Sequence, residues 1–524
     1  MSNGRREGDS FSVSRRAVLG AGVGAGLGLA ALLTGCTDTS GAVSKPPATL
    51  PATLGPSSFK LPNTKLPSGP IKVSIVDSGD LKANYWGSMA TAYQNKHPNV
   101  TVSYNGTNWN TIQQSITLGL QNGTAPDSFQ LPGGVTIGQA IQNGWVMAFE
   151  DAVPDFQKII KAYPAGASAN GVTMFNGKSY LYSPSGNIRL QDAMLYNTKL
   201  VEAAGYDPSE SISWDDFRAM LKKITTKGAG QYYGIIAGLT QPNQLNFPVA
   251  DLAILAGANF NYQGINWKTG EYNYTDDRVV DALELFLAIK SDGSFFPDSV
   301  SMDAPGARGR FPLGVAGVIM QGSWNVRPWQ QSNPDFKFGI ALPPRQDPKS
   351  KHMLNYTPGG SNYYVLNAKM KPETQKAIGD MFRFTMSKSG QTLWAQSDGS
   401  GDPAQYPGVF ADAPLSPLEA RAQKLAQENM VITPEPAVRN PDINIVYQLQ
   451  KAVTPNFSQV CVGLFTGQLT GVKQQLKKLN DAMSKAREDA IAAAKKQGAS
   501  VSLDDFAFSD FDADKPYSKL YKKA

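Results

Sequence analysis

Pairs of neighbouring carboxylates are the residues of this sequence best suited to acid–base chemistry. Asp215-Asp216 and Asp276-Asp277 are such pairs, and a glycoside hydrolase needs two carboxylates flanking the bond that it breaks. Adjacent acids at the start of a helix, however, usually cap the helix. We therefore expect no enzymatic activity, and a secreted carbohydrate-active hydrolase remains an alternative that turnover of an oligosaccharide would establish.

Serine nucleophiles and metal ligands are also poorly represented. The sequence has no G-x-S-x-G motif, and neither His97 nor His352 has a histidine or cysteine at metal-ligand spacing. Residues 510–514 begin like a calcium-binding EF-hand loop, but Lys515 stands where that loop requires glycine. We expect no metal site and no cofactor.

The first 36 residues carry a different kind of chemistry. A Ser-Arg-Arg motif at residues 14–16 is followed by a Gly/Ala/Leu run that ends in Leu-Thr-Gly-Cys at residues 33–36. This pattern is similar to a twin-arginine lipoprotein signal, in which a peptidase cuts before a lipidated cysteine. We expect a signal peptide over residues 1–35 and lipid on Cys36, outside the cytoplasmic membrane. An uncleaved anchor helix is the alternative.

Composition limits the partners of the mature chain. Hydrophobic residues make up 41% and charged residues only 18%, so the surface must rely on Asn, Gln, Ser, Thr and Tyr. The net charge is +6, and the leader's four arginines and two acids leave +4 without a basic block. Nucleic acid is therefore not an expected partner. With Cys36 lipidated, Cys461 has no cysteine to pair with and should be a small core residue.

A tether and alternating strands and helices follow the leader. Residues 36–70 hold seven prolines past Cys36 and read as a tether. Apolar residues alternate over residues 71–76 and 100–104, which predicts strands, and recur at helical spacing over residues 85–93 and 112–120. This strand–helix order favours a parallel sheet covered by helices.

The rest of the chain is more helical. Ser213 should cap a helix whose Trp214 belongs to the core, and apolar periodicity predicts further helices over residues 279–287, 372–385 and 472–483. The last of these helices should lie along a surface with its charged side solvated.

Several segments, taken in order, resemble a known family. They are Gly123–Asp127, Leu195–Leu200, Trp214–Phe217, Phe311–Trp324 and Gly359–Ser361. Together they are similar to the type 1 extracellular solute-binding proteins of ABC importers, which include maltose-binding protein. The resemblance spans about residues 70 to 400. The C-terminal part looks like that of the larger oligosaccharide and aldouronate binders.

This resemblance implies an α/β fold of two lobes, joined by crossing strands, that close on a ligand. It places lobe I at residues 71–186 plus 361–410 and lobe II at residues 187–360 plus 411–524. The implied protein is a monomer that captures an oligosaccharide and delivers it to ABC permease subunits in the membrane. A sugar-sensing protein without a transport role is the alternative.

A pyranose ring has an apolar face and a fringe of hydroxyls, so its site needs flat aromatic surface and fixed polar groups. Trp324 matches the ring-stacking tryptophan of the maltose-binding relatives, and packing at the hinge is its alternative role. Trp109, just after the second strand, should face the cleft unless it is only a surface-loop residue.

The remaining candidates have weaker patterns. Tyr363 and Tyr364 lie near a crossing strand, where alternation lets at most one face the cleft. Asp80 and Trp86 lie near the first strand–helix turn, where a relative has ligand-contacting charges, and Asp80 could equally cap a helix.

Arginines complete the set of candidates. Arg327 and Asn325 adjoin Trp324 and could contact the ligand or simply be solvated. Arg189, Arg308 and Arg439 would matter if the sugar is acidic, because a guanidinium pairs with a carboxylate through two hydrogen bonds.

Overall fold

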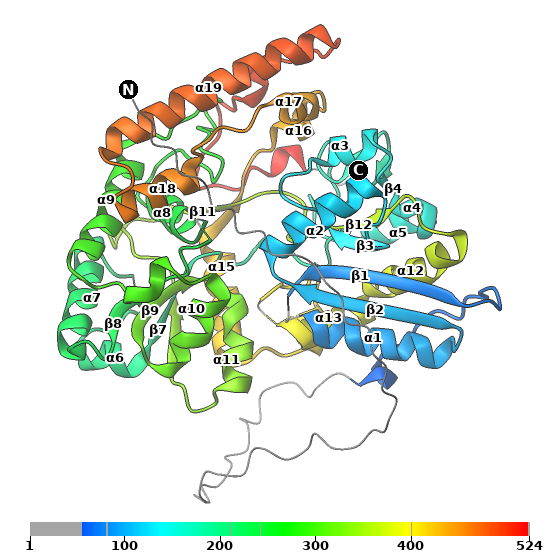
Figure 1. The fold of residues 1–524 in the computed structure, drawn as a ribbon, viewed down its shortest axis with the longest axis horizontal. Helices are drawn as coiled ribbons and strands as arrows, with labels where there is room; N and C mark the ends of the chain where they lie inside the picture. The colour runs from blue at the N-terminus through cyan, green and yellow to red at the C-terminus, as the bar shows by residue number, and fades with distance from the viewer. Residues whose placement is uncertain (1–54, 80–81, 210, 242, 400, 522–524) are drawn as a thin grey trace, which may run out of the picture. The chain divides into compact units, whose positions relative to one another are not determined.

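The computed structural model contains two larger sheets covered by helices and two short strand pairs (Figure 1). It describes residues 55–79, 82–209, 211–241, 243–399 and 401–521. The predicted signal peptide and Cys36 lie outside these residues. Among the helices described, none is both long and apolar enough to cross a membrane.

The first sheet has the strand order β2-β1-β3-β12-β4. Its strands are β1 (Ile71–Ser78), β2 (Val100–Thr107), β3 (Ser128–Gln130), β12 (Tyr364–Asn367) and β4 (Val146–Met147). The predicted strands β1 and β2 are confirmed, and they pair in parallel. The sheet is nevertheless mixed, because β12 runs antiparallel to β3 and β4.

Alternation along β1 explains how this sheet is covered. Ile71, Val73 and Ile75 point into a buried apolar cluster. Helices α1 (Ala83–Lys96) and α12 (Pro372–Thr385) contribute their apolar faces to the same cluster. Burial of this apolar surface is the main force that holds the helices on the sheet.

The second sheet has the order β10-β7-β9-β8, from β10 (Phe338–Ala341), β7 (Ala193–Asn197), β9 (Ala316–Gln321) and β8 (Tyr233–Ile236). Every residue of β7 and β9 is buried, as expected of strands covered on both faces. The apolar clusters that contain these two strands also include side chains of α7 (Trp214–Gly228), α8 (Asn243–Leu255) and α9 (Asp277–Ser291).

The chain passes between the two sheets more than once. It runs from β4 in the first sheet to β7 in the second, and returns from β10 to β12. Helix α13 (Lys388–Asp398) packs in the first-sheet cluster, whereas α15 (Pro417–Asn429) packs in the second-sheet cluster. The predicted division into two lobes stays a prediction.

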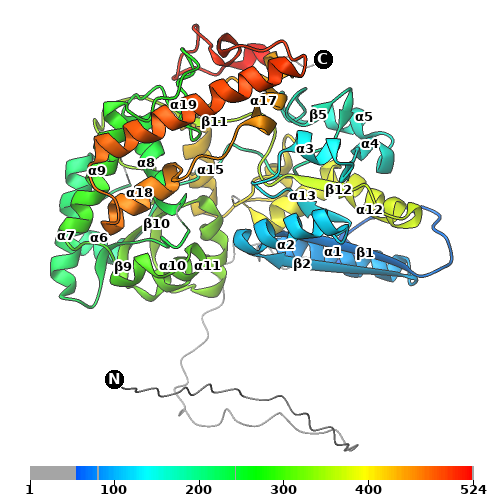
Figure 2. The same ribbon diagram turned by 45° about the horizontal axis from the view of Figure 1, so that its top comes forward.

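The C-terminal segment packs mainly on the helices of the second sheet. Its helices are α16 (Pro436–Arg439), α17 (Ile443–Leu449), α18 (Phe457–Thr466) and α19 (Val472–Lys496). Helix α19 lies along α9 and α18, as Figure 2 shows, with Leu476 and Leu479 buried and its charged side exposed. This confirms the expected surface helix. Before it, β13 (Met430–Ile432) pairs in parallel with β11 (Leu354–Tyr356).

The predicted tether requires a correction at its C-terminal end. Phe59 and Leu61 are each only 6% exposed and pack into the cluster beneath the first sheet. Thr64 donates a hydrogen bond to Asp380 at 2.7 Å. Because prolines surround these two apolar residues, the sequence shows no periodic pattern there and did not predict their burial. Residues from Phe59 onward therefore belong to the folded body.

The acid pairs considered for catalysis lie at helix starts. Ser213 caps α7 by accepting a hydrogen bond from the Asp216 amide, and Asp276 caps α9 by accepting from the Arg278 amide. The expected capping is thus confirmed. Trp214 is 7% exposed and Cys461 fully buried, so both are core residues, as expected.

Candidate ligand-binding cleft

A cavity of about 500 Å³ lies between elements of the two sheets. Ser78, at the end of β1, and Trp109, at the start of α2 (Trp109–Asn122), line its first-sheet side. Gln321, at the end of β9, and Trp324 line its second-sheet side, and Arg189 reaches it from a crossing segment. Its volume falls within the range of roughly 300–1,000 Å³ that is common for ligand pockets.

Amide side chains dominate the polar lining of this cavity. Each Asn or Gln amide can both donate and accept hydrogen bonds, which suits a ligand that carries many hydroxyl groups. The charged residues of the lining are fewer: Lys82, Arg189, Arg308 and Asp402. The lining amides are Asn108, Asn110, Gln113, Gln191, Gln241, Asn243, Gln244, Gln321 and Asn362.

Trp109 is placed by a helix cap. Asn108 is the N-cap of α2, and its side chain accepts a hydrogen bond from the Thr111 amide at 2.9 Å. This cap fixes Trp109 as the first helical residue, directly after β2. The indole packs in part against the cluster that contains Ile112, and the residue lines the cavity as well.

Trp324 is held more tightly. Its ring lies against Gly322, where an added Cβ would come within 1.9 Å of the indole, so a larger residue there would push the ring aside. The guanidinium of Arg189 lies over the ring, with Cζ 5.2 Å from the ring centroid. This cation–π contact fixes the indole but covers part of its face. A sugar that stacks on Trp324 must therefore share the ring with Arg189 or displace it.

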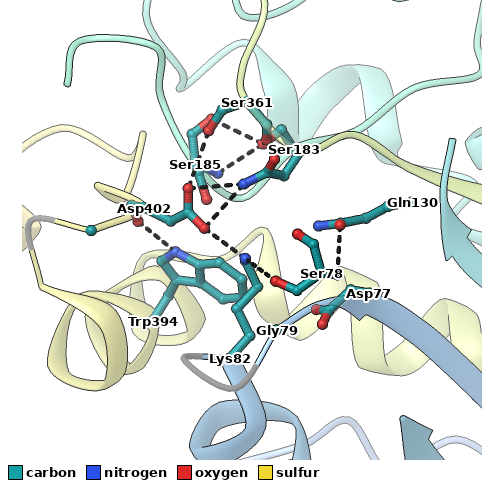
Figure 3. A network of polar contacts seen from close by, with 12 residues as sticks. Asp77, Ser78, Gly79, Lys82, Gln130, Ser183, Ser185, Ser361, Trp394 and Asp402 are labelled. Atoms are coloured by element: carbon teal, nitrogen blue, oxygen red, sulfur yellow. Dashed lines mark hydrogen bonds and ion pairs between the residues drawn. The ribbon is translucent and has the colours of Figure 1, made fainter. Parts of the chain in front are cut away.

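A buried ion-pair network, part of which Figure 3 shows, contributes residues to the lining of the cavity. Lys82 Nζ lies 2.7 Å from Asp402 Oδ2, and the two side chains are 3% and 4% exposed. Arg189 pairs with the other carboxylate oxygen, and Asn362 donates to the same carboxylate at 3.0 Å. The indole of Trp394 donates to the Asp402 carbonyl oxygen at 2.9 Å.

Opposing effects set the pKa values in this network. Burial acts to raise the pKa of Asp402, but Lys82 and Arg189 outweigh it and lower that pKa to about 2. Burial and the charge of Asp402 raise the pKa of Asp398 to about 7. Asp402 is thus the anion that balances Lys82 and Arg189.

Trp86 and Tyr364 are corrections to the sequence-based site. Both are fully buried in the core of the first sheet. The Trp86 indole donates to the Tyr364 hydroxyl at 2.9 Å, and that hydroxyl donates in turn to Asp77. Because their polar atoms are satisfied inside the core, we assign both residues a structural role.

Three further candidates also have structural partners. The Tyr363 hydroxyl accepts from the Gly360 amide at 3.0 Å and steadies that turn. Arg327 is 3% exposed and forms a two-point ion pair with the fully buried Glu419. Asn325 is fully buried and donates to Gly322 O at 3.0 Å. Arg327 and Asn325 are therefore neither solvated nor exposed to a ligand, the two roles that the sequence had suggested. Asp80, another candidate, lies outside the described residues.

The arginine candidates divide between the cavity and the C-terminal segment. Arg189 and Arg308 line the cavity. Arg439 lies over Phe508, with Cζ 3.9 Å from the ring centroid, and donates to the Ala507 carbonyl. Within the described ranges, no cluster of three or more His, Cys, Asp or Glu residues is arranged to hold a metal ion.

Sequence reasoning missed Lys82, Asp402 and the amide lining. Lys82 and Asp402 are 320 positions apart, so no local motif joins them. The low charge content, with its reliance on Asn and Gln, was the available signal for the amides.

Comparisons with known proteins agree with this fold. The model of the family described as bacterial extracellular solute-binding protein matches residues 88–421. A protein of Brucella abortus (strain 2308) that is named as a binding protein is 21% identical over 334 residues, covering 63% of this chain and 75% of its own.

Solved structures share the fold. A chitin oligosaccharide binding protein has a TM-score of 0.61 at 16% identity, covering 80% of this chain and 99% of its own. The maltose/maltodextrin-binding domain of Bdellovibrio bacteriovorus, bound to maltotriose, has a TM-score of 0.56 at 18% identity, covering 80% and 100%.

The expected α/β fold of periplasmic binding proteins is therefore confirmed. The matched segment exceeds half of the chain and includes much of both sheets. The family is non-catalytic, in keeping with acid pairs that cap helices. The chain belongs to the bacterial extracellular solute-binding protein family.

Proposed function

We propose that this protein is the lipid-anchored solute-binding subunit of an ABC importer and that it captures an oligosaccharide in the cavity between its two sheets. The observation that carries the proposal is the lining: one tryptophan from each side together with nine amide side chains. Flat aromatic surface complements the apolar face of a pyranose, and the amides complement its hydroxyls.

The similar structures support this ligand class. One of those proteins binds chitin oligosaccharide, one is bound to maltotriose, and a third similar structure, RafE, is in complex with raffinose. Arg189 and Arg308 line the cavity, and a guanidinium can pair with a carboxylate, so uronic oligosaccharides belong in the same test. Ligand binding requires no bond to be made or broken.

Calorimetric titration of the full-length protein in detergent tests the proposal. The probes are maltotriose, raffinose, chitotriose, xylotriose and an aldouronic trisaccharide. We expect one class to bind with a Kd in the micromolar range or below, about −8 kcal/mol. Trp109→Ala should weaken that binding, whereas Trp145→Ala, a tryptophan of similar burial outside the lining, should not. If none of these sugars gives a heat of binding, the proposal is contradicted.

The anchor and the partner need separate tests. Lipid on Cys36 predicts that the protein is found with the membrane and that Cys36→Ser releases it into the medium. Release of the unsubstituted protein would contradict the anchor. Deletion of the gene should abolish uptake of the bound sugar, and unchanged uptake with altered gene induction would indicate the sensing alternative.

A further inference from the structure

Helix α17 lies between α19 and α3 (Ile137–Gln142), as Figures 1 and 2 show. Helix α19 belongs with the second sheet, because its Leu476 is buried in the apolar cluster that also contains side chains of α7 and α9. Helix α3 belongs with the first sheet, because its Ala140 shares a cluster with Phe129 of β3. Helix α17 thus links the two sheets outside the chain crossings, and it lies beyond residues 88–421, which match the family model.

The attachment of α17 to α19 is apolar. Ile443 and Val446 of α17 are fully buried, in a cluster with Ala490 and Ala494 of α19. Among the residues that the structure describes, every buried member of this cluster lies within residues 437–506. Burial of this apolar surface holds α17 in place. Any movement of α19 relative to the first sheet therefore carries α17 with it.

The contact of α17 with α3 is polar. The side-chain amide of Gln448 donates to the side-chain oxygen of Gln142, the last residue of α3. Gln142 is exposed and Gln448 is half-buried, so water reaches both partners. A hydrogen bond at the surface exchanges protein partners for water partners at little net cost. This contact can therefore break and form again while the apolar cluster of α17 stays intact.

A loop on the side of the first sheet makes the second contact. Gly171 lies in this loop, and Thr173 O of the same loop accepts from the amide of Tyr180, which packs on the cluster of α3. Asn444 Nδ2 of α17 donates to Gly171 O at 3.0 Å. Gly171 has a φ of +78°, and a Cβ there would lie 2.0 Å from the Ala437 carbonyl oxygen of α16. Glycine at this position thus lets the loop lie directly against α16.

We propose that residues 436–449, which include α16 and α17, form a clasp. The clasp holds the two sheets in the arrangement of this structure, and it must release α3 and the Gly171 loop before the cavity between the sheets can widen. The apolar cluster keeps the clasp on α19, so the polar contacts are the ones that yield. Rotation about the chain crossings would separate α3 from α17, so the strength of these contacts sets how often the cavity opens. Only the ligand measurement below rests on the proposed function.

Paired charge substitutions test the clasp without a ligand. Gln142→Glu with Gln448→Glu places like charges in contact and should break the clasp. Gln142→Glu with Gln448→Lys replaces the hydrogen bond by an ion pair and should retain it. This opposite-charge pair is the matched control, because it changes the same two positions.

Spin labels on one helix of each sheet report the spacing of the sheets. Thr91→Cys on α1 and Gln331→Cys on α11 (Val326–Ser332), both at exposed positions, carry the labels, and Cys461 is buried. Double electron–electron resonance on the full-length protein in detergent should give a broader distance distribution for the like-charge pair than for the unsubstituted protein. The opposite-charge pair should give the unsubstituted distribution. Equal distributions in all three proteins would overturn the inference, and so would an opposite-charge pair as broad as the like-charge pair.

A cross-link gives the opposite perturbation. Gln142→Cys with Gln448→Cys, joined by a short bis-maleimide, should slow release of the tightest-binding trisaccharide at least tenfold in stopped-flow fluorescence, because the cavity cannot widen. Gln142→Cys with Asn143→Cys, joined on one side of the contact only, is the control and should release the sugar at the normal rate. Unchanged release from the cross-linked clasp would contradict the inference. If no sugar binds, the proposed function fails, and the spin-label distances still test the clasp.

Discussion

The core beneath the first sheet and the cavity between the sheets are both rich in aromatic rings, but they use their polar atoms differently. In the core, Trp86 donates to Tyr364 and Tyr364 donates to Asp77, so each group is satisfied within the protein. In the cavity, Trp109 and Trp324 adjoin amides that line open volume, although several of these amides, such as Gln241 and Asn362, also bond within the protein. A tryptophan becomes a binding candidate through its place at the end of a strand, and residue type alone does not decide it.

Trp86→Ala should produce the largest effect. The change removes a fully buried indole and leaves the Tyr364 hydroxyl without its donor. A cavity of this kind costs about 3–5 kcal/mol of unfolding free energy. Urea denaturation measures the loss, and calorimetry on the remaining folded protein should show unchanged affinity. A variant of normal stability with weakened sugar binding would place Trp86 in the site after all.

Asp402→Asn tests the network that joins the core to the cavity. The change leaves Lys82 and Arg189 without their shared carboxylate. This loss should lower the free energy of unfolding by about 3 kcal/mol. The pKa of Asp402 is lowered to about 2, so its contribution to stability is fully present above its unfolded pKa near 4. That contribution is lost as the pH falls toward 2.

Denaturation curves between pH 7 and pH 2.5 check both parts of this prediction. The unsubstituted protein should lose stability below pH 4 more steeply than Asp402→Asn does. Equal acid slopes for the two proteins would show that the carboxylate is not stabilised by its cations.

Trp324→Ala should affect binding more than stability. Loss of about 100 Å² of stacking surface should reduce the binding free energy by about 2.5 kcal/mol. Arg189 can offset part of this loss by moving onto the ligand. We expect the Kd for the bound oligosaccharide to rise at least tenfold while the melting temperature changes little. An unchanged Kd would remove Trp324 from the site.

Asp251→Asn should give the smallest change, and one that depends on pH. Burial raises the pKa of Asp251 to about 7, so the folded state favours the protonated carboxyl. This contribution is fully present below pH 4 and is lost as the pH rises through 7. The asparagine cannot ionise, and its oxygen can still accept from Tyr262.

Thermal melts of Asp251→Asn should therefore show a gain in stability at pH 8 that is absent at pH 4.5. Glu202→Gln, an exposed carboxylate on α6 (Thr198–Ala203), serves as the control. A gain of equal size at both pH values would contradict a raised pKa for Asp251.

Local patterns predicted much of the fold. Alternation revealed β1 and β2, and the caps at Ser213 and Asp276 marked two helix starts. The antiparallel entry of β12 was missed because its partners are more than 200 residues away. Phe59 and Leu61 were assigned to a tether because two apolar residues among prolines form no periodic pattern.

The site was harder to predict. Trp109 and Trp324 line the cavity, and each lies within three residues after the end of a strand. Trp86 and Arg327 also carry hydrogen-bond donors at the ends of their side chains. These donors bond to Tyr364 and Glu419, which are distant in the sequence. Burial of such groups depends on long-range packing, which a single sequence does not show.

A crystal structure of the full-length protein with its tightest-binding oligosaccharide tests the central claim most directly. The account predicts sugar rings in the cavity between the sheets, in contact with both Trp109 and Trp324 and hydrogen-bonded to the lining amides. Sugar bound elsewhere on the protein, with this cavity left to solvent, would contradict it.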